Sequence, residues 1–501
     1  MDRAVIAKLI RLHLLTPGGI CTLTGSLARE GMTLMALLRF AAHYYPEHCA
    51  LVSEEKRLTY KEMYHQAHRL ATLLRTTYSI EAGMHVGLLC RNHPMLTLLL
   101  PALSRLGAKI KLFNTDIPPR TINETAKQNA IDLLIVDEER QDALLTDGLP
   151  CTILSAEGLS QALSDYSPAT DAALPRIRRG REIAVFTGGS SGHYKEAPRQ
   201  MSLFQFLPPF FALLRDIRID ERESVFLPLP VYHGFGLATL IVSILMGKKV
   251  CLMKKFDSKQ ALQMIAREKI DVLSLVPAML ARLWQTDCAS SLMASVKCII
   301  CGGDRLDRKW IKTTHQLLGP VVYNLYGTSE AGFFMLATPQ DLMANEEVTI
   351  GRPIKGVRCR IEQPASNGVG SLWVQSRWAM RGMKNKWQDT GDLVCCHADG
   401  LYFYRGRADK MVVCGGENVY PEHVERIINE HPEVVKSLVF PVPDERYGMV
   451  LHAKLELTAA STLSPEDLIS WLRPRLSRFE LPHQIVIQPI SVLETGKVKR
   501  Q

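Results

Sequence analysis

Short apolar runs alternate with segments of helical periodicity along most of the chain. Residues 84–90 and 248–253 are runs rich in Val, Leu and similar residues, and each precedes a helical segment, 94–107 and 258–269 respectively. Buried parallel strands read as continuous apolar runs, and crossover helices cover the faces of such sheets. The pattern therefore predicts an α/β fold with a large N-terminal domain of helix-covered, mostly parallel sheets, and it continues at 131–137, 271–276 and 277–285.

A different pattern begins near Val369, where short strands separated by turns replace the alternation. Residues 369–377 and 400–407 predict a small β-rich subdomain. After them, a helix at 421–430, a strand at 435–442 and a helix at 465–476 predict a small α+β unit. We therefore expect three parts, with 1–405 as the large N-terminal domain, 406–410 as a hinge and 411–501 as a small mobile C-terminal domain.

The composition is that of a large globular protein. The 501 residues are 47% hydrophobic and 22% charged, which suits about two to four domains with buried cores. The 12 cysteines are scattered, and Cys298 and Cys301 lack a second pair at zinc-site spacing, so we expect a buried strand there and not a metal site. No secretory signal is evident, and we expect free thiols and a cytoplasmic location.

Two segments raise the question of membrane contact. The uncharged run 225–247 contains Pro228 and Pro230, so only 237–247 is left as an apolar helix, and we expect a buried core helix instead of a membrane span. Residues 1–15 are basic and amphipathic, which suits packing on the domain or a membrane surface, and we favour packing. The net charge of +9 suits anionic ligands, but no basic block with interleaved aromatics indicates nucleic acid.

The segment 185–200, VFTGGSSGHYKEAPRQ, has the composition of a phosphate loop. Its glycines let backbone N–H groups converge on an anion, its serines add hydroxyl donors, and Lys195 adds a positive charge. It is not a Walker loop, because Lys195 lies three residues past Gly192, Glu196 follows it and Pro198 prevents an immediate helix. By itself, the segment is equally compatible with a surface loop.

Six further motifs follow along the chain. They are PLPVYHGFGL (228–237), CGGD (301–304), NLYGTSEAG (324–332), DTGDL (389–393), YRGRADKMVVCGGENVYPEHVE (404–425) and ETGKVKR (494–500). In this order and at these separations they resemble the adenylate-forming superfamily of acyl-CoA synthetases, peptide-synthetase adenylation domains and luciferases. The resemblance is greatest to AMP-binding fatty or aryl acid–CoA ligases, and it extends from about Thr33 to the last residue.

The resemblance implies an activity and a set of nucleotide-binding residues. Members use ATP and Mg²⁺ to convert a carboxylic acid into an acyl-adenylate with release of pyrophosphate, and many then transfer the acyl group to the thiol of CoA. By resemblance, Tyr326 lies against the adenine, Asp392 and Arg407 bind the ribose, and Glu330 holds Mg²⁺. The ATP- or AMP-binding residues implied in this way are Thr187, Gly188, Gly189, Ser190, Ser191, Gly192, Lys195, Gly302, Gly303, Asp304, Asn324, Leu325, Tyr326, Gly327, Thr328, Ser329, Asp392 and Arg407.

The resemblance also implies how the remaining motifs act. Lys497 would bridge the carboxylate and the α-phosphate during adenylation, and Asp409 would be the hinge about which the small domain rotates. Gly415 and Gly416 would border the pantetheine tunnel for CoA, where a side chain would obstruct it. The implied catalytic residues are Lys497, Glu330 and His233, and the implied acyl-pocket residues are Val231, Tyr232, His233, Phe235, Gly236 and Gly332, with His233 as a gate.

Other features of the sequence indicate which kind of acid is the substrate and which thiol accepts the acyl group. Segment 226–245 contains no acid that could pair with a substrate ammonium, which disfavours amino acids and favours a fatty or aryl acid, with fatty acid metabolism as one setting. No carrier domain follows Lys497, so we expect free CoA as acceptor, with a separate acyl carrier protein as an alternative. A further alternative is a non-catalytic nucleotide-binding relic, because Tyr194 and Glu196 depart from the family's phosphate loop.

Overall fold

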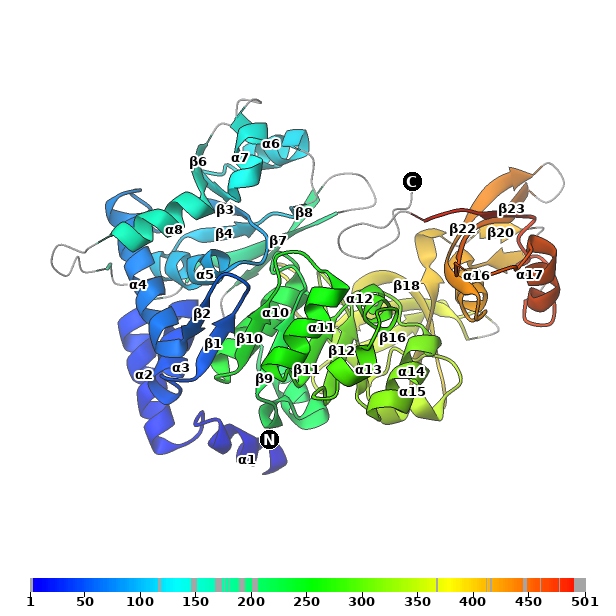
Figure 1. Cartoon of the computed structure of the whole chain (residues 1–501), viewed down its shortest axis with the longest axis horizontal. Helices are drawn as coiled ribbons and strands as arrows, with labels where there is room; N and C mark the ends of the chain where they lie inside the picture. Colours follow the sequence, from blue (N-terminus) through cyan, green and yellow to red (C-terminus); the bar gives the residue numbers. More distant parts are fainter. Residues whose placement is uncertain are drawn as a thin grey trace. The chain divides into compact units, whose positions relative to one another are not determined.

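The computed structural model covers most of the chain and divides it into two compact units. The first unit comprises Met1–Leu275, Thr286–Ile300 and Arg377–Lys384, and the second comprises Val276–Gln285, Cys301–Ser376 and Asn385–Gln501. Each unit contains its own helices and strands, labelled in Figure 1. The residues that the structure describes are 3–115, 119–145, 151–166, 174–175, 177–178, 180–188, 194–200, 206–365, 368–410, 412–414, 417–444, 448–459, 461–476 and 478–490.

The first unit contains a six-stranded sheet of five parallel strands and one antiparallel edge strand. In spatial order the strands are β6 (Thr152–Ser155), β5 (Leu133–Val136), β3 (His85–Leu89), β4 (Lys109–Leu112), β7 (Glu182–Gly188) and β8 (Tyr194–Gln200). Only β7 and β8 pair as an antiparallel hairpin, in which Gly188 is opposite Tyr194. The accompanying helices are α4 (Tyr60–Thr76), α5 (Pro94–Leu106), α6 (Pro119–Gln128), α7 (Glu138–Leu145) and α8 (Ala156–Asp165).

The second sheet of this unit is also mostly parallel. Its strands in spatial order are β11 (Val272–Leu275), β9 (Ser224–Leu227), β10 (Lys249–Leu252), β1 (Cys49–Val52) and β2 (Arg57–Thr59), with β2 antiparallel to β1 at the edge. Every residue of β9 and β11 is buried, as expected for parallel strands with helices on both faces. The other helices of the unit include α2 (Pro17–Glu30), α3 (Leu34–Tyr44), α9 (Leu207–Ala212), α10 (Gly234–Leu245), α11 (Ser258–Glu268) and α13 (Ala289–Leu292).

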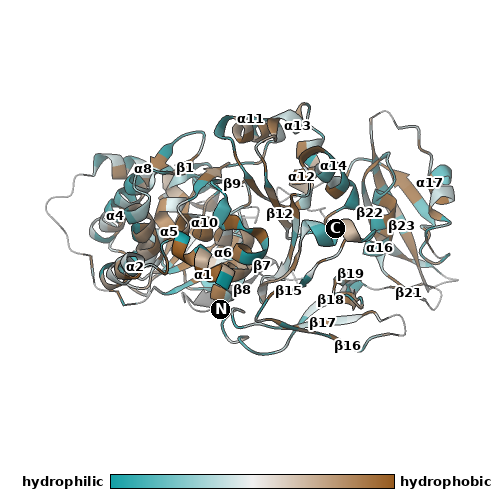
Figure 2. Cartoon of the chain, turned by 90° about the horizontal axis from the view of Figure 1, so that it is seen from below, coloured by the Kyte–Doolittle hydropathy of each residue, from teal (hydrophilic) through white to brown (hydrophobic). Residues whose placement is uncertain are grey.

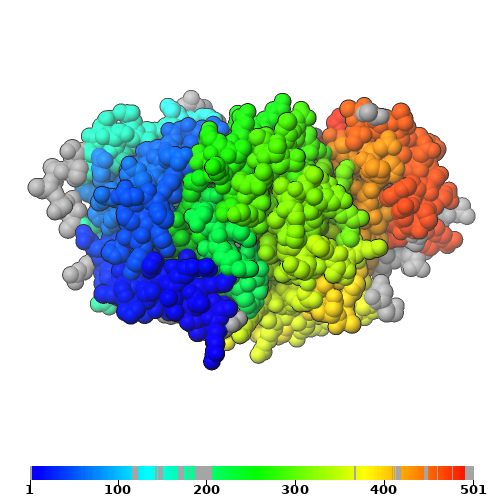
Figure 3. Space-filling view, turned by 60° about the horizontal axis from the view of Figure 1, so that its bottom comes forward, coloured from blue at the N-terminus to red at the C-terminus, as the bar shows by residue number. Residues whose placement is uncertain are grey.

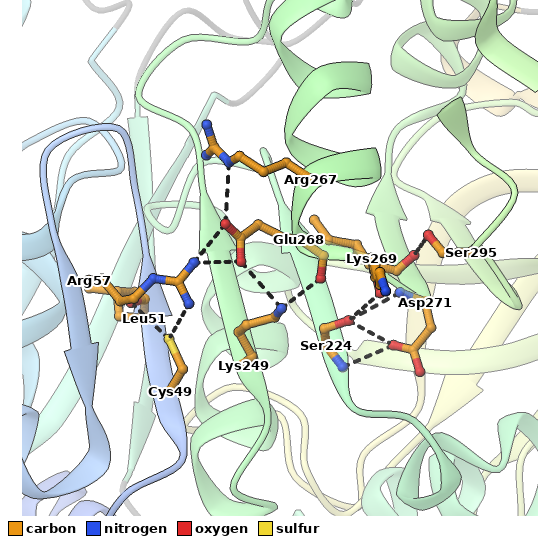
Figure 4. Close-up of polar contacts among 11 residues, drawn as sticks. Cys49, Leu51, Arg57, Ser224, Lys249, Arg267, Glu268, Lys269, Asp271 and Ser295 are labelled. Atoms are coloured by element: carbon orange, nitrogen blue, oxygen red, sulfur yellow. Dashed lines mark hydrogen bonds and ion pairs between the residues drawn. The ribbon is translucent and has the colours of Figure 1, made fainter. Parts of the chain in front are cut away.

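A network of ion pairs and hydrogen bonds lies at the amino-terminal ends of β9, β10 and β11 (Figure 4). The Nη2 atom of Arg57 lies 2.7 Å from both carboxylate oxygens of Glu268, and the Lys249 Nζ atom donates to the Glu268 carbonyl at 2.6 Å. Nearby, Asp271 accepts hydrogen bonds from the backbone N–H of Ser224 and of Glu223, each at 2.9 Å. Ligands of open α/β sheets bind at the opposite, carboxyl ends of the strands, so this network contributes to stability.

The N-terminal helix α1 (Arg3–Arg11) packs on the first unit. Val5 and Leu9 are buried, and the Lys8 ammonium donates to the Asp220 carboxylate at 3.0 Å and to the Leu214 carbonyl at 2.7 Å. Arg11 also pairs with Asp220, whose side chain is fully buried. Figure 3 shows the N-terminal residues, in dark blue, lying against the green part of the surface. The contacts therefore favour packing over a membrane surface for the amphipathic N-terminal segment.

The apolar helix α10 differs from the expectation of a buried core helix. It begins earlier, at Gly234, and only Gly236, Leu240 and Ser243 are fully buried in it. The rest of the helix is half-buried or exposed. Leu240, Ile241 and Ile244 of α10 line a small apolar groove together with residues of α3 and α5. Among the described residues, no helix is both long and apolar enough to span a membrane.

The second unit contains three antiparallel strands with helices beside them in sequence, followed by an antiparallel subdomain. Strands β13 (Val322–Thr328), β14 (Gly332–Ala337) and β15 (Arg352–Pro353) pair antiparallel, and the helices beside them in sequence are α12 (Pro277–Trp284), α14 (Arg308–Leu318) and α15 (Pro339–Ala344). The β-rich subdomain predicted from the turn pattern is a four-stranded antiparallel sheet of β16 (Arg358–Glu362), β17 (Gly370–Gln375), β18 (Gln388–Cys396) and β19 (Tyr402–Arg407). At the division between the units, β12 (Cys298–Gly302) is buried throughout, as expected for the cysteine pair.

The C-terminal residues form a small α+β assembly. Its main sheet contains β22 (Val434–Asp444), β23 (Gly448–Leu457) and β24 (Gln484–Ile487), and a hairpin of β20 (Val412–Cys414) and β21 (Glu417–Val419) precedes it. Helices α16 (Pro421–Asn429) and α17 (Pro465–Leu472) supply Val424, Ile428 and Leu468 to its core. Figure 2 shows hydrophobic and hydrophilic residues mixed along β22 and β23, as expected for strands with one buried face.

The predicted fold class is confirmed. Helix-covered, mostly parallel sheets occupy the N-terminal part, an antiparallel subdomain follows, and a small α+β assembly ends the chain. Helix α17 ends at Leu472 and not near residue 476, because Pro474 cannot continue a helix. The domain boundaries at 405 and 411 stay a prediction.

Candidate active site

Two predicted nucleotide-binding residues, Tyr326 and Arg407, contact the carboxylate of a third, Asp392, in the second unit. The Tyr326 hydroxyl donates to Oδ2 of Asp392, and Nη1 of Arg407 donates to its Oδ1 at 3.0 Å. Asp392 and Arg407 are directly opposite one another in the β18–β19 register, which explains why two distant motifs share one site. Arg407 also donates to the Thr390 carbonyl at 2.8 Å. The backbone of the DTGDL motif is therefore fixed by the same arginine.

Burial dominates the electrostatics of this carboxylate. The Asp392 side chain is 9% exposed, and burial raises the pKa of Asp392 although the hydrogen bonds from Tyr326 and Arg407 oppose the rise. Burial, followed by the negative charge of Asp392, raises the pKa of Tyr326 well above its usual value. The phenol therefore stays a hydrogen-bond donor. A carboxylate has about four lone-pair positions, so Asp392 keeps acceptor capacity beyond these two donors.

The YGTSEAG motif forms a tight turn between β13 and β14. Thr328 is opposite Gly332, and the Ala331 N–H donates to the Thr328 hydroxyl at 3.0 Å. A Cβ at Gly327 would lie 2.3 Å from the Gly332 carbonyl oxygen, so only glycine fits there. The turn leaves Ser329 and Glu330 exposed at its tip, where both side chains are accessible to a ligand.

The remaining residues of the predicted adenine site lie on β12, β13 and the loop after β12. Gly303 has a φ of +82°, which favours glycine, and Asp304 is exposed and accepts the backbone N–H of Arg305 at 2.8 Å. Asn324 is buried, and its amide donates to the Thr349 carbonyl at 2.9 Å. Gly302 is buried and Leu325 half-buried. The Asn324 amide thus supports the backbone beside the strand, and its predicted contact with adenine stays a prediction.

The predicted acyl-pocket residues of the first unit lie where β9 leads into α10. Val231 and Tyr232 are buried, and His233 is the half-buried residue that precedes the helix, with its ring 4.7 Å from that of Tyr232. A Cβ at Gly236 would lie 2.3 Å from the Pro230 carbonyl oxygen, so glycine is required for this approach of helix to loop. Phe235 is half-buried, and Gly332 belongs to the turn of the second unit.

Several predicted site residues are described only in part or lie outside the described residues. For Thr187, Gly188 and Lys195 only the backbone is described, which places Thr187 opposite Lys195 in the β7–β8 hairpin. Asp409 belongs to a short 3₁₀ turn (Ala408–Lys410), and nothing further is described of its side chain. The residues outside the described part of the chain are Gly189, Ser190, Ser191, Gly192, Gly415, Gly416 and Lys497.

The structure adds a residue that the sequence patterns did not single out. Glu422, in the first turn of α16, accepts the Tyr404 hydroxyl at 2.5 Å and the Lys410 ammonium at 3.3 Å. The Arg305 guanidinium, just after the CGGD motif, donates to the Glu422 backbone carbonyl. The only sequence signal was an acidic residue near a helix start, which is common for electrostatic reasons and says nothing about partners so far away in the chain.

Comparison with family models gives two matches. A model described as AMP-binding enzyme matches residues 38–383, and one described as AMP-binding enzyme C-terminal domain matches residues 423–497. Among curated proteins, a 2-succinylbenzoate–CoA ligase of Bacillus velezensis is 26% identical over 461 residues, covering 88% of this chain and 91% of the relative. A 2-succinylbenzoate–CoA ligase of Staphylococcus aureus is 25% identical over 484 residues, covering 90% and 96%.

Solved structures share the fold at lower sequence identity. An o-succinylbenzoate CoA synthetase of Bacillus subtilis, in complex with its acyl-adenylate intermediate, has a TM-score of 0.79 at 22% identity over 92% of this chain and 96% of that one. An anthranilate CoA ligase in complex with anthranoyl-AMP has a TM-score of 0.83 at 19% identity over 93% and 95%. At these identities the likeness concerns the fold.

Proposed function

Since the chain belongs to the AMP-binding enzyme family, we propose that it is an acid–thiol ligase that works in two half-reactions. In the first, a carboxylate oxygen of the acid attacks the α-phosphorus of ATP, forming an acyl-adenylate and releasing pyrophosphate. In the second, the thiol of CoA attacks the carbonyl carbon, forming the thioester and releasing AMP. The observation that supports this proposal best is the buried Asp392 carboxylate with Tyr326 and Arg407 around it.

The cluster around Asp392 suits a ribose. Its remaining acceptor positions would take the two ribose hydroxyls, and Arg407 would keep the carboxylate ionised and oriented. Glu330 suits Mg²⁺, because a single exposed carboxylate beside phosphate oxygens and waters is a usual magnesium arrangement. When bound, the metal would neutralise charge that develops on the phosphates. Lys195 and the glycines of 188–192 would cover the β- and γ-phosphates.

An aryl carboxylic acid is the substrate class that we propose first. Residues 231–237 are apolar, aromatic or small apart from His233, and no acid in 226–245 could pair with an ammonium group. The curated relatives are named for 2-succinylbenzoate, and one neighbour binds anthranoyl-AMP, which adds support for an aromatic acid over a long fatty acid. For the acceptor we propose free CoA, with the glycines at 415 and 416 beside its pantetheine arm.

A carboxylic acid panel tests the proposal as a whole. The protein would be incubated with ATP, Mg²⁺, labelled pyrophosphate and one acid at a time, including 2-succinylbenzoate, anthranilate, benzoate, an amino acid and fatty acids of several lengths. Acid-dependent exchange of label into ATP is expected for aromatic acids, and thioester is expected when CoA is added. Exchange with none of the acids would contradict the proposal and favour a nucleotide-binding relic, whose motivation is Glu196 in the phosphate loop.

Separating the half-reactions tests the role proposed for Lys497. A cation about 4 Å from the reacting carboxylate and phosphate is worth roughly 4 kcal/mol at an effective dielectric near 20, or about a thousandfold in rate. Lys497→Ala should therefore lose adenylation by about that factor, yet still convert supplied acyl-adenylate and CoA into thioester. Lys499→Ala, two residues away, is the matched control and should retain both activities. Equal loss of both half-reactions in Lys497→Ala would show that its role is different.

A further inference from the structure

The segment that leads into the proposed acid site is held by one buried asparagine. Asn92 is 4% exposed, and its amide nitrogen donates to the Leu229 carbonyl at 2.7 Å and to the Leu227 carbonyl at 3.4 Å. In return, the Val231 N–H donates to the Asn92 amide oxygen at 2.9 Å. Positions 228 and 230 are prolines, which have no N–H, so this segment has few donors of its own to anchor it. Asn92 therefore supplies hydrogen bonds that the proline-rich segment cannot make for itself.

Asn92 is itself held at the carboxyl ends of two parallel strands. It lies in the loop between β3 and α5, and Asp137 follows β5 directly. One Asp137 oxygen accepts the Arg91 N–H at 3.0 Å, and the other is 2.9 Å from Nε2 of His93. The other ring nitrogen of His93 accepts the Leu96 N–H at 3.4 Å and so caps α5. The residues on both sides of Asn92 are thus fixed to the sheet and to the helix.

A metal ion is the competing explanation for this cluster. Ligand atoms of Cys90, His93 and Asp137 lie within 4.8 Å of one another, and all three residues are buried. However, both His93 nitrogens already have partners, both Asp137 oxygens accept hydrogen bonds, and the Cys90 thiol donates to the Ile135 carbonyl at 3.5 Å. Burial also raises the pKa of Cys90 well above its usual value, which disfavours the thiolate that a metal would bind. Hydrogen bonding explains the cluster without a metal.

The far end of the segment is fixed in a similar way. The Thr115 hydroxyl, just beyond β4, donates to the Tyr232 hydroxyl at 3.3 Å, and both residues are buried. The Tyr232 ring lies beside the His233 ring, with the centroids 4.7 Å apart. The positions of Tyr232 and His233 therefore depend on Asn92 at the start of the segment and on Thr115 at its end.

We propose that Asn92 is a positioning residue of the acid site, which fixes the backbone of 227–231 and thereby sets where Tyr232 and His233 face the acid. The inference rests on the proposed function, because the acid site is part of it. Asn92 itself would touch neither the acid nor the nucleotide. Its loss should therefore change the binding and the choice of acid while ATP binding is preserved.

Kinetics of two Asn92 variants test this split. Asn92→Ala removes all three hydrogen bonds, and Asn92→Asp keeps an acceptor for the Val231 N–H but places an oxygen against the Leu229 carbonyl. In pyrophosphate exchange, both variants should raise the KM for the acid at least tenfold, change the ranking of acids in the panel, and leave the KM for ATP within about twofold. Asn129→Ala is the matched control, since the amide of this residue, directly after α6, also donates to a backbone carbonyl, that of Thr125 at 2.8 Å. It should change neither KM.

Hydrogen exchange measured by mass spectrometry tests the same inference without any substrate. Peptides that cover 225–237 should exchange faster in Asn92→Ala than in the wild type, and the increase should be smaller and confined to the Tyr232 end in Thr115→Val. Zinc analysis of the wild-type protein accompanies these measurements. Stoichiometric zinc that Asn92→Ala retains and Cys90→Ser loses would overturn the hydrogen-bonding explanation of the cluster.

The outcomes separate the two proposals. If the wild type exchanges label with no acid, the proposed function fails, while hydrogen exchange still decides whether Asn92 holds the segment. If the wild type is active and the KM values for acid and ATP rise together in the Asn92 variants, the residue acts on the whole fold and the inference is wrong. Failure of both Asn92 variants to fold, with Asn129→Ala folded, would lead to the same conclusion.

Discussion

Replacing Asp392 with asparagine removes one negative charge from the centre of the nucleotide site and changes its shape very little. The amide oxygen can still accept the Tyr326 hydroxyl, but Arg407 loses its ionised partner. Hydrogen bonds to charged groups contribute about 1.5–3 kcal/mol. The Arg407 side chain is 36% exposed, and solvent screening reduces the contribution of this pair to folding to about 1 kcal/mol. Because burial raises the pKa of Asp392 in spite of this pair, the neutral amide also avoids a desolvation cost, and we expect the unfolding free energy to change by less than about 1 kcal/mol.

The effect on ATP should be larger than the effect on stability. If the ribose hydroxyls donate to this carboxylate, the variant loses charge-assisted bonds of about 1.5–3 kcal/mol, so the KM for ATP should rise roughly tenfold to a hundredfold. Pyrophosphate exchange at varied ATP and saturating acid measures this KM. Asp399→Asn is the matched control, because Asp399 is an exposed aspartate in the β18–β19 turn, and it should change the KM less than twofold. An unchanged KM for ATP in a folded Asp392→Asn protein would refute the ribose role.

The pH dependence offers a second check on Asp392. Burial raises the pKa of Asp392 against the opposing effects of Tyr326 and Arg407. The carboxylate therefore takes up a proton at a higher pH than an ordinary aspartate, whose pKa is about 3.9. In the wild type, the KM for ATP should rise on the acid side, and in Asp392→Asn this rise should disappear. For stability the sign is opposite, because a raised folded-state pKa favours the folded state most below the unfolded-state pKa. That contribution is lost as the pH rises through the folded-state pKa.

Two further predictions concern stability and are measured by chemical unfolding. Glu268→Gln should lower the unfolding free energy by about 1–2 kcal/mol, because the Glu268 side chain is 6% exposed, while its partners Arg57 and Arg267 are more than half exposed and can return to water. Glu362→Gln, at a pair with Arg360 in which both side chains are exposed, should cost less than about 0.5 kcal/mol, and equal effects of the two variants would contradict the role assigned to Glu268. Burial is the largest effect on the pKa of Glu268 and would raise it, but the hydrogen bonds and charges of Arg57 and Lys249 together outweigh burial, and the pKa is lowered. This contribution is therefore present above the unfolded-state pKa and is lost as the pH falls through the folded-state pKa. Gly327→Ala should destabilise by about 2 kcal/mol or more, since its Cβ would meet the Gly332 carbonyl at 2.3 Å. Gly25→Ala, in α2 with no atom within 4 Å of the new Cβ, should stabilise the protein by about 0.5–1 kcal/mol. If Gly327→Ala were the more stable of the two variants, the close approach of Gly327 to the Gly332 carbonyl would be wrong.

Local patterns were sufficient to predict the fold class and most elements. The runs at 84–90, 248–253 and 271–276 are the buried parallel strands β3, β10 and β11, because a strand covered on both faces is apolar at most positions. The resemblance to adenylate-forming enzymes, predicted from the order of the motifs, is confirmed by the family match over residues 38–383. The helix predicted to end near residue 476 ends at Leu472. Pro474 was a local signal for this end, but the prediction was based on hydrophobic periodicity alone.

Tertiary structure decided which distant residues share a contact. The register of β18 and β19 places Arg407 opposite Asp392, and the β13 strand brings the Tyr326 hydroxyl to the same carboxylate. No local pattern encodes such a pairing, because strand register depends on the turns and on the buried face of the whole sheet. The half-buried state of α10 was missed for the same reason, because the exposure of a helix depends on which elements pack against each of its faces.

The amino-acid sequence by itself determined the alternation of strands and helices and the residue types available for chemistry, since both follow from periodicity and composition within short segments. Only the tertiary structure decided that Asn92, from the loop after β3, holds the proline-rich backbone before His233. An amide donates and accepts equally well anywhere in a chain, and its role is set by which carbonyls the fold places within hydrogen-bonding distance. Buried polar partners of this kind are a property of packing, and packing joins residues that the sequence keeps far apart.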